Sequence, residues 1–117
     1  MTERVHTMNF DRPSIIKLFP NGEGRVVRLG DFAVTRLTYA PGWRWSTSHT
    51  EVIARQWCRH PHRGFVLNGK MAVEFENGSR LVLEPGDAFD LPAGHDQVVI
   101  GAEPCVLFEI SMRNSSG

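Results

Sequence analysis

Residues 59–97, RHPHRGFVLNGKMAVEFENGSRLVLEPGDAFDLPAGHDQ, hold three of the five histidines of the chain and a turn signal at nearly even intervals. His60 and His62 lie at the start of this stretch and His95 near its end, and His49 lies shortly upstream. Short apolar runs alternate with Asn-Gly, Pro-Gly and Pro-Ala-Gly turns, which is typical of small antiparallel β-proteins. Imidazoles supplied by separate strands can converge on a metal ion, so this stretch is the first place to look for function.

The sequence on either side continues the same short-strand pattern. Trp43-Arg44-Trp45 is expected to start an extended segment with both indoles on one face. The two Asn-Gly pairs, Asn68-Gly69 and Asn77-Gly78, predict hairpin turns because both residue types tolerate positive φ. We expect strands at 25–29, 32–39, 65–67, 70–76, 80–83, 88–91, 98–100 and 105–112. Strands this short at this spacing predict an all-β, antiparallel sandwich or barrel with little or no helix.

The length of 117 residues indicates one domain. We expect an N-terminal arm at 1–24, in which the short apolar piece at 15–19 could form an edge strand, a β-domain at 25–112 and a polar tail at 113–117. The core candidates are the apolar residues of the expected strands, namely Phe32, Val34, Phe65, Leu67, Met71, Val73, Phe75, Leu81, Leu83, Phe89, Leu91, Phe108 and Ile110.

Composition excludes several functional classes. The chain has 13 basic and 13 acidic residues, so neither nucleic acid nor an acidic membrane surface is expected as a partner. No apolar run approaches the roughly 20 residues that a membrane helix needs, and the N-terminus lacks an apolar signal core. Two cysteines without CxxC spacing favour reduced thiols, and we expect a cytoplasmic protein.

Two motifs within residues 41–111 resemble the cupin superfamily of small jelly-roll β-barrels. Gly42, six residues and His49 match the opening of the first cupin motif, and Gly69 matches its closing glycine. Gly86, five residues and Pro92-Ala93-Gly94 match the second motif. The segments PGWRWS, HRGFVLNG and PAGHD are similar to a subgroup of single-domain bacterial cupins that generally has no assigned activity. The resemblance implies a jelly-roll barrel and a homodimer, and the edges of so small a barrel also call for cover.

The metal ligands that the resemblance implies are three His and one Glu, and this sequence changes their places. Glu51 stands at the second His position of the first motif and His62 at its Glu position. Gln97 stands at the His position of the second motif, with His95 two residues earlier and on the same strand face. We therefore predict that His49, His62 and His95 bind a divalent transition metal, which could be Ni, Zn, Fe, Mn or Cu. The alternative is that each His caps a turn or forms hydrogen bonds at the barrel mouth.

Four further residues are predicted to support this centre. Glu51 is either a carboxylate ligand or a solvated loop residue, and His60 is a pocket residue rather than a ligand. Cys58 is a ligand, a reactive thiol with a lowered pKa, or a small buried apolar residue. Gln97 is a weak metal ligand and a good hydrogen-bond donor, so substrate orientation is its expected role.

These residues support three functional hypotheses. The first is a metal-binding cupin-type barrel that binds a small polar or anionic molecule, with metal-dependent oxygenase or isomerase activity if it is an enzyme. The second is a non-catalytic ligand-binding or regulatory module without bound metal. The third is an isomerase or epimerase that uses His and Glu51 as base and acid without metal. The sequence does not decide whether the protein is an enzyme.

Overall fold

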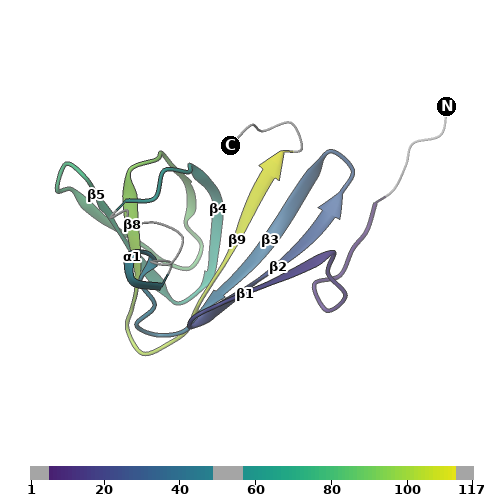
Figure 1. Ribbon diagram of the computed structural model, residues 1–117, viewed down its shortest axis with the longest axis horizontal. Helices are drawn as coiled ribbons and strands as arrows, with labels where there is room; N and C mark the ends of the chain where they lie inside the picture. The colour runs from purple at the N-terminus through teal and green to yellow at the C-terminus, as the bar shows by residue number, and fades with distance from the viewer. Residues whose placement is uncertain (1–5, 49–56, 113–117) are drawn as a thin grey trace.

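The computed structural model describes residues 6–48 and 57–112, which form nine strands and one short helix (Figure 1). In chain order they are β1 (Ile15–Phe19), β2 (Gly22–Leu29), β3 (Phe32–Tyr39), α1 (Trp45–Ser48), β4 (His62–Asn68), β5 (Lys70–Phe75), β6 (Arg80–Leu83), β7 (Ala88–Leu91), β8 (His95–Ile100) and β9 (Cys105–Met112). No helix within these residues has the length and apolar character that a membrane crossing requires.

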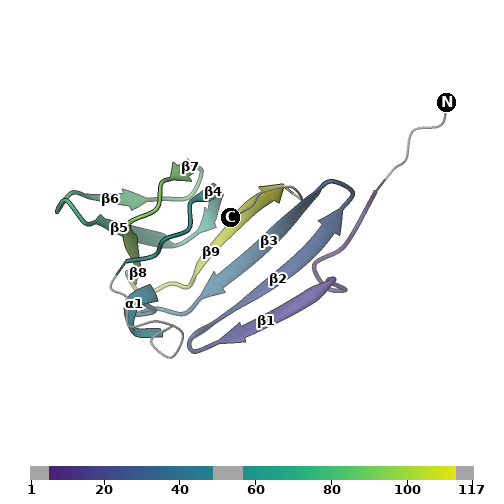
Figure 2. The same ribbon diagram turned by 45° about the horizontal axis from the view of Figure 1, so that its top comes forward.

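The strands form two antiparallel sheets. The large sheet has the order β1-β2-β3-β9-β4-β7, and the small sheet has the order β6-β5-β8. The small sheet lies near β4 and β9 of the large sheet (Figure 2). Strands β1 and β2 form the opposite edge of the large sheet. The prediction of an all-β, antiparallel jelly-roll sandwich is confirmed.

The core fills the space between the two sheets. Tyr39 and Trp43 pack ring to ring with centroids 4.0 Å apart, and both side chains are buried. Phe19 at the end of β1 packs against Tyr39, with ring centroids 5.7 Å apart. The buried cluster consists of Tyr39, Trp43, Val66, Met71, Val73, Leu83, Phe89, Leu91, Val99, Cys105 and Leu107.

Residues 15–24, which the sequence places in an N-terminal arm, are part of the large sheet. β1 pairs with β2 from Ile15 opposite Val26 to Phe19 opposite Gly22. The preceding residues lie on the outer face of this sheet, because the Phe10 ring meets Phe108 edge-on at 5.4 Å. Arg25 also donates a hydrogen bond to the Phe10 carbonyl oxygen at 3.0 Å.

One of the two Asn-Gly hairpins is correct and the other is wrong. Asn77-Gly78 connects β5 and β6, which pair in the small sheet. Asn68-Gly69 instead connects β4 in the large sheet with β5 in the small sheet, so the chain changes sheet at this point. Gly69 has φ +74°, and Asn68 donates a hydrogen bond to the Pro104 carbonyl oxygen at 3.2 Å. A glycine with positive φ is therefore compatible both with a hairpin turn and with a connection between the two sheets.

The segment after Gly42 also differs from expectation. Trp43 is fully buried, but Trp45 begins the helical turn α1 instead of continuing an extended segment. The carboxylate of Asp96 on β8 explains this change, because it accepts hydrogen bonds from the Ser46 backbone N–H at 3.0 Å and the Ser46 hydroxyl at 2.7 Å. The helical turn at Trp45 thus depends on Asp96, a residue distant in the sequence, and the local sequence alone does not determine it.

Several core candidates face outward. On β4 and β9 the buried residues are Val66, Cys105 and Leu107, whereas Phe65 and Phe108 stack on the outer face with centroids 5.1 Å apart. Both faces of these strands carry apolar residues, so the alternation does not reveal which face is inside. The other core candidates that are exposed are Phe32, Leu67, Leu81 and Ile110.

Strands β4 and β9 approach unusually closely at Gly64, which pairs with Glu109. A Cβ atom at position 64 would collide with the backbone carbonyl of Phe108, and this atom cannot move without shifting β9. This close approach brings the start of β4 against the middle of β9.

We therefore predict that Gly64→Ala lowers the free energy of unfolding by about 2 kcal/mol, since the added methyl group forces two strands apart. Gly24→Ala is the matched control, because its methyl group meets the flexible end of Leu37 at 3.1 Å. Urea unfolding of both variants measures the difference. Equal and small losses would show that β4 and β9 tolerate the extra atom.

Candidate metal centre

An isolated β-bridge places Cys58 beside His95. Cys58 donates its backbone N–H to the His95 carbonyl oxygen at 2.6 Å, and Gly94 donates to the Cys58 carbonyl oxygen at 2.7 Å. Residues directly opposite each other in an antiparallel pair present their side chains on the same face. The bridge thus brings a thiol and an imidazole together from segments 37 residues apart in the sequence.

His62 comes from the other sheet. It is the first residue of β4, and its Nδ1 lies 2.8 Å from Oε1 of Glu109 on β9. Gly64 lies opposite Glu109, so His62 occupies a diagonal position on the same face of the large sheet. The Nε2 atom of His62 lies 3.5 Å from the Sγ atom of Cys58.

The partners of the two Nδ1 atoms orient both rings. His95 Nδ1 lies 2.7 Å from the Pro92 carbonyl oxygen, which can only accept a hydrogen bond. In His62 the Nδ1 atom donates to the Glu109 carboxylate. Both rings therefore direct Nε2 towards the sulfur of Cys58, which is the arrangement in which a carboxylate or carbonyl positions a metal-binding histidine.

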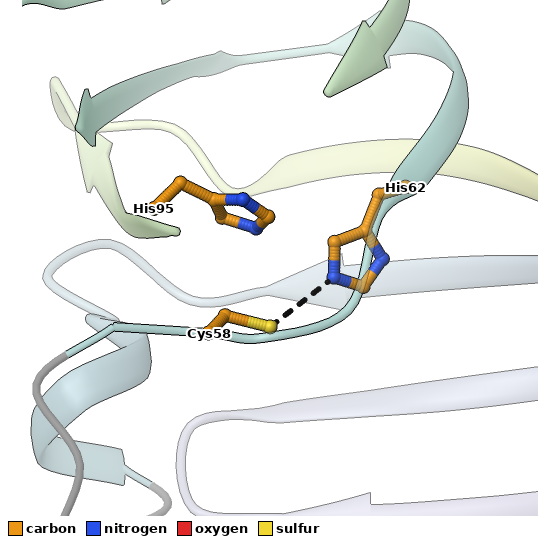
Figure 3. A group of neighbouring side chains, drawn as sticks. All are labelled: Cys58, His62 and His95. Carbon is orange, nitrogen blue, oxygen red and sulfur yellow. Dashed lines mark hydrogen bonds between the residues drawn. The ribbon is translucent and has the colours of Figure 1, made fainter. Parts of the chain in front are cut away.

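The three side chains converge between the sheets (Figure 3). One ligand atom from each of Cys58, His62 and His95 lies within 4.8 Å of the other two. The rings of His62 and His95 have centroids 5.2 Å apart and an edge-to-face orientation. His95 is fully buried, and its Nε2 atom has no hydrogen-bond partner among the described residues. A buried imidazole nitrogen without a partner is costly in a protein interior, and a metal ion would satisfy it.

The electrostatics of the cluster favour a thiolate. Burial raises the pKa of Cys58, but the adjacent imidazoles of His62 and His95 outweigh burial and lower it to about 6. Burial lowers the pKa of His62, whereas Cys58 and Glu109 raise it to about 10. Cys105 has no such neighbours, and burial alone raises its pKa to about 11. Cys58 is thus suited to metal binding or nucleophilic chemistry, and Cys105 to a place in the core.

The structure brings together two of the three predicted ligands, His62 and His95, with Cys58, for which the sequence leaves the role of ligand open. His49 and Glu51 lie outside the described residues, so their role as ligands stays a prediction. The side chain of His60 is exposed and does not belong to the cluster. Gln97 is buried on β8, two residues beyond His95.

Glu109 is a member of the site that the sequence does not indicate. It lies 47 residues after His62 in an apolar strand and belongs to no motif. Only the pairing of β9 with β4 reveals it.

Several solved structures share the fold of this chain. An oxalate decarboxylase variant from Bacillus subtilis aligns over the whole chain with a TM-score of 0.68 and 16% identity, and the chain spans only 32% of that protein. A sugar phosphate isomerase of the cupin superfamily from Silicibacter pomeroyi aligns over 92% of this chain and 76% of its own, with a TM-score of 0.64 and 18% identity. A cupin-like protein from Thermotoga maritima aligns over 85% of this chain and 74% of its own, with a TM-score of 0.64 and 19% identity.

The chain therefore has the cupin fold. No protein-family model and no curated protein matches its sequence. Identities this low establish the architecture and leave the activity to be argued from the site.

The electrostatics make a direct prediction for the metal-free protein. Because the pKa of Cys58 is lowered to about 6, its thiolate should persist as the pH falls from 9 until it is protonated near pH 6. The measurement is the ultraviolet absorbance of the thiolate, taken as the difference between the wild type and Cys58→Ser. Cys105 is present in both proteins and cancels. A midpoint near the ordinary value of 9.0 would contradict the coupling to His62 and His95.

Proposed function

We propose that this protein is a metal-binding cupin-fold protein that binds a small polar or anionic molecule at its metal. Cys58, His62 and His95 would be the ligands, and Glu109 would hold His62 in place. The observation that carries this proposal is the convergence of three donor atoms within 4.8 Å, one of which is the buried, unpartnered Nε2 atom of His95.

The donor set limits the choice of metal. A thiolate with two imidazoles suits borderline and soft ions such as Zn, Fe(II), Ni and Cu, whereas Mn prefers oxygen ligands. Three protein ligands are also the usual number where a fourth position receives water or substrate. Among the solved structures with this fold, the oxalate decarboxylase of Bacillus subtilis has Mn(II) centres, and its activity is not carried over here.

The bound metal would supply Lewis acidity or, with iron or copper, redox chemistry. The side chains of His62 and Glu109 are 24% and 17% exposed, so this part of the cluster is in contact with solvent. His49 as a further ligand, the homodimer and the cytoplasmic location stay predictions.

Metal binding is tested with protein purified without an affinity tag, stripped with a chelator and reloaded with Zn(II). We expect one zinc per chain and, at a free concentration about 100-fold above Kd, a rise in Tm of roughly 10 °C. His62→Ala should lose both effects because it removes a ligand.

His60→Ala is the matched control, since it removes an exposed histidine two residues away. In Co(II)-loaded protein, Cys58→Ser should lose the thiolate charge-transfer absorbance and Cys105→Ala should keep it. Equal zinc binding by His60→Ala and His62→Ala would contradict the assignment.

Glu109 is predicted to strengthen metal binding through His62. Glu109→Gln replaces a charged acceptor by a neutral one of the same shape, and we expect zinc affinity to fall about 10–100-fold. Competition with a chromophoric chelator measures the affinity. Glu84→Gln, which removes an exposed carboxylate paired with Lys70 at 3.4 Å, should leave it unchanged. An unchanged affinity in Glu109→Gln would show that the carboxylate does not position the ring.

A second candidate function is covalent catalysis with Cys58 as the nucleophile. One observation favours it, namely that Glu109, His62 and Cys58 contact one another in this order. A carboxylate behind an imidazole behind a thiolate is the order in which a cysteine nucleophile is activated. Two results together would favour a catalytic Cys58 over a metal centre. The protein would bind none of Zn, Fe(II), Ni and Cu, and an alkylating reagent would modify Cys58 in preference to Cys105.

A further inference from the structure

Three consecutive buried polar residues begin β8, and they differ in their hydrogen bonds. His95, Asp96 and Gln97 are all less than 5% exposed. Asp96 accepts hydrogen bonds from Arg44 at 2.8 Å, from the backbone and hydroxyl of Ser46, and from the backbone N–H of Gln97. The amide nitrogen of Gln97, like Nε2 of His95, has no partner among the described residues.

Gln97 lies on the inner face of the small sheet. It pairs with Val73, which belongs to the buried cluster, and Phe75 pairs with His95 in the same register. Side chains alternate along a strand, so Gln97 points to the same side as His95 while Asp96 points to the other. Two residues along a strand span about 6.6 Å. The backbone positions of Gln97 and His95 are therefore separated by about the length of a small molecule.

An unpaired buried amide is unfavourable for folding. Burying such a group without a hydrogen bond costs more than an apolar side chain of similar shape would. The fully bonded Asp96 next to it shows that this strand can satisfy a buried polar residue where the fold depends on one. Since no described residue supplies a partner for the Gln97 amide nitrogen, a bound small molecule is the partner that we infer.

We propose that Gln97 is a specificity-determining residue that forms a hydrogen bond with the second oxygen of a small α-hydroxycarboxylate. This inference rests on the proposed function, since the carboxylate of the same molecule would bind the metal held by Cys58, His62 and His95. A side-chain amide both donates and accepts, which suits a hydroxyl group. Because His95 and Gln97 are only two residues apart on one strand, we take the two oxygens to lie on neighbouring carbons.

The test uses zinc-loaded protein and two probes, glycolate and acetate, which differ by one hydroxyl group. Calorimetry should show that the wild type binds glycolate about tenfold more tightly than acetate, the gain expected from one hydrogen bond. Gln97→Leu should lose this preference, with acetate affinity and zinc content unchanged. In nuclear magnetic resonance spectra, the side-chain amide signal that Gln97→Leu lacks should shift in the wild type on addition of glycolate and not of acetate.

Stability separates this role from a structural one. Because Gln97→Leu removes an unpaired polar group, its Tm should equal that of the wild type or exceed it by about 4 °C. A Gln97→Leu protein that is destabilised or unfolded would assign the amide a structural partner and overturn the proposal.

The remaining outcomes separate the two proposals. Zinc-loaded wild type that binds glycolate and acetate equally, or whose Gln97 amide signal does not respond, overturns the role of Gln97 and leaves the metal centre intact. A wild-type protein that binds no zinc overturns both.

Discussion

The β-bridge between Cys58 and His95 is the constraint on which the rest of the site depends. Its hydrogen bonds, at 2.6 Å and 2.7 Å, attach the segment that precedes β4 to the edge of β8. From this point the chain crosses to the large sheet, where His62 begins β4. This backbone contact therefore places the thiol of Cys58 beside the imidazole of His95. It also fixes the start of the segment that leads to His62. Because these are backbone hydrogen bonds, the arrangement does not depend on the side chains that form the cluster.

The large sheet contributes His62 to the site, and the close packing of β4 against β9 positions this residue. Gly64 allows β4 to approach the carbonyl groups of β9, and this approach puts His62 within 2.8 Å of Glu109. A carboxylate at this position accepts a hydrogen bond from Nδ1 and leaves Nε2 directed at Cys58. The position of the His62 imidazole thus depends on the close strand approach that Gly64 allows.

Much of the fold could be predicted from the sequence, because the turns of this chain are explicit. The strands at 32–39, 80–83, 88–91 and 105–112 have the predicted bounds, and each is delimited by Gly, Pro or Asn residues. Asn68-Gly69 was misassigned because a positive φ at a glycine fits both a hairpin and a change of sheet. The inner faces of β4 and β9 were misassigned because Phe65 and Phe108 on the outer face are as apolar as Val66 and Leu107 on the inner face.

The site could be predicted only where a motif contains it. His62 and His95 are predicted from the cupin motifs. For Cys58 the sequence leaves three roles open, and the bridge to His95 favours that of ligand, whereas Glu109 is found only from the register of β9 with β4. These two residues also change the charge of the centre. A thiolate and a carboxylate together would balance a divalent ion, so the centre would attract an anion less than one built from neutral imidazoles. Recognition of a small molecule there would depend on hydrogen bonds from the inner faces of the two sheets, and among the described residues the unpartnered amide of Gln97 is placed to provide one.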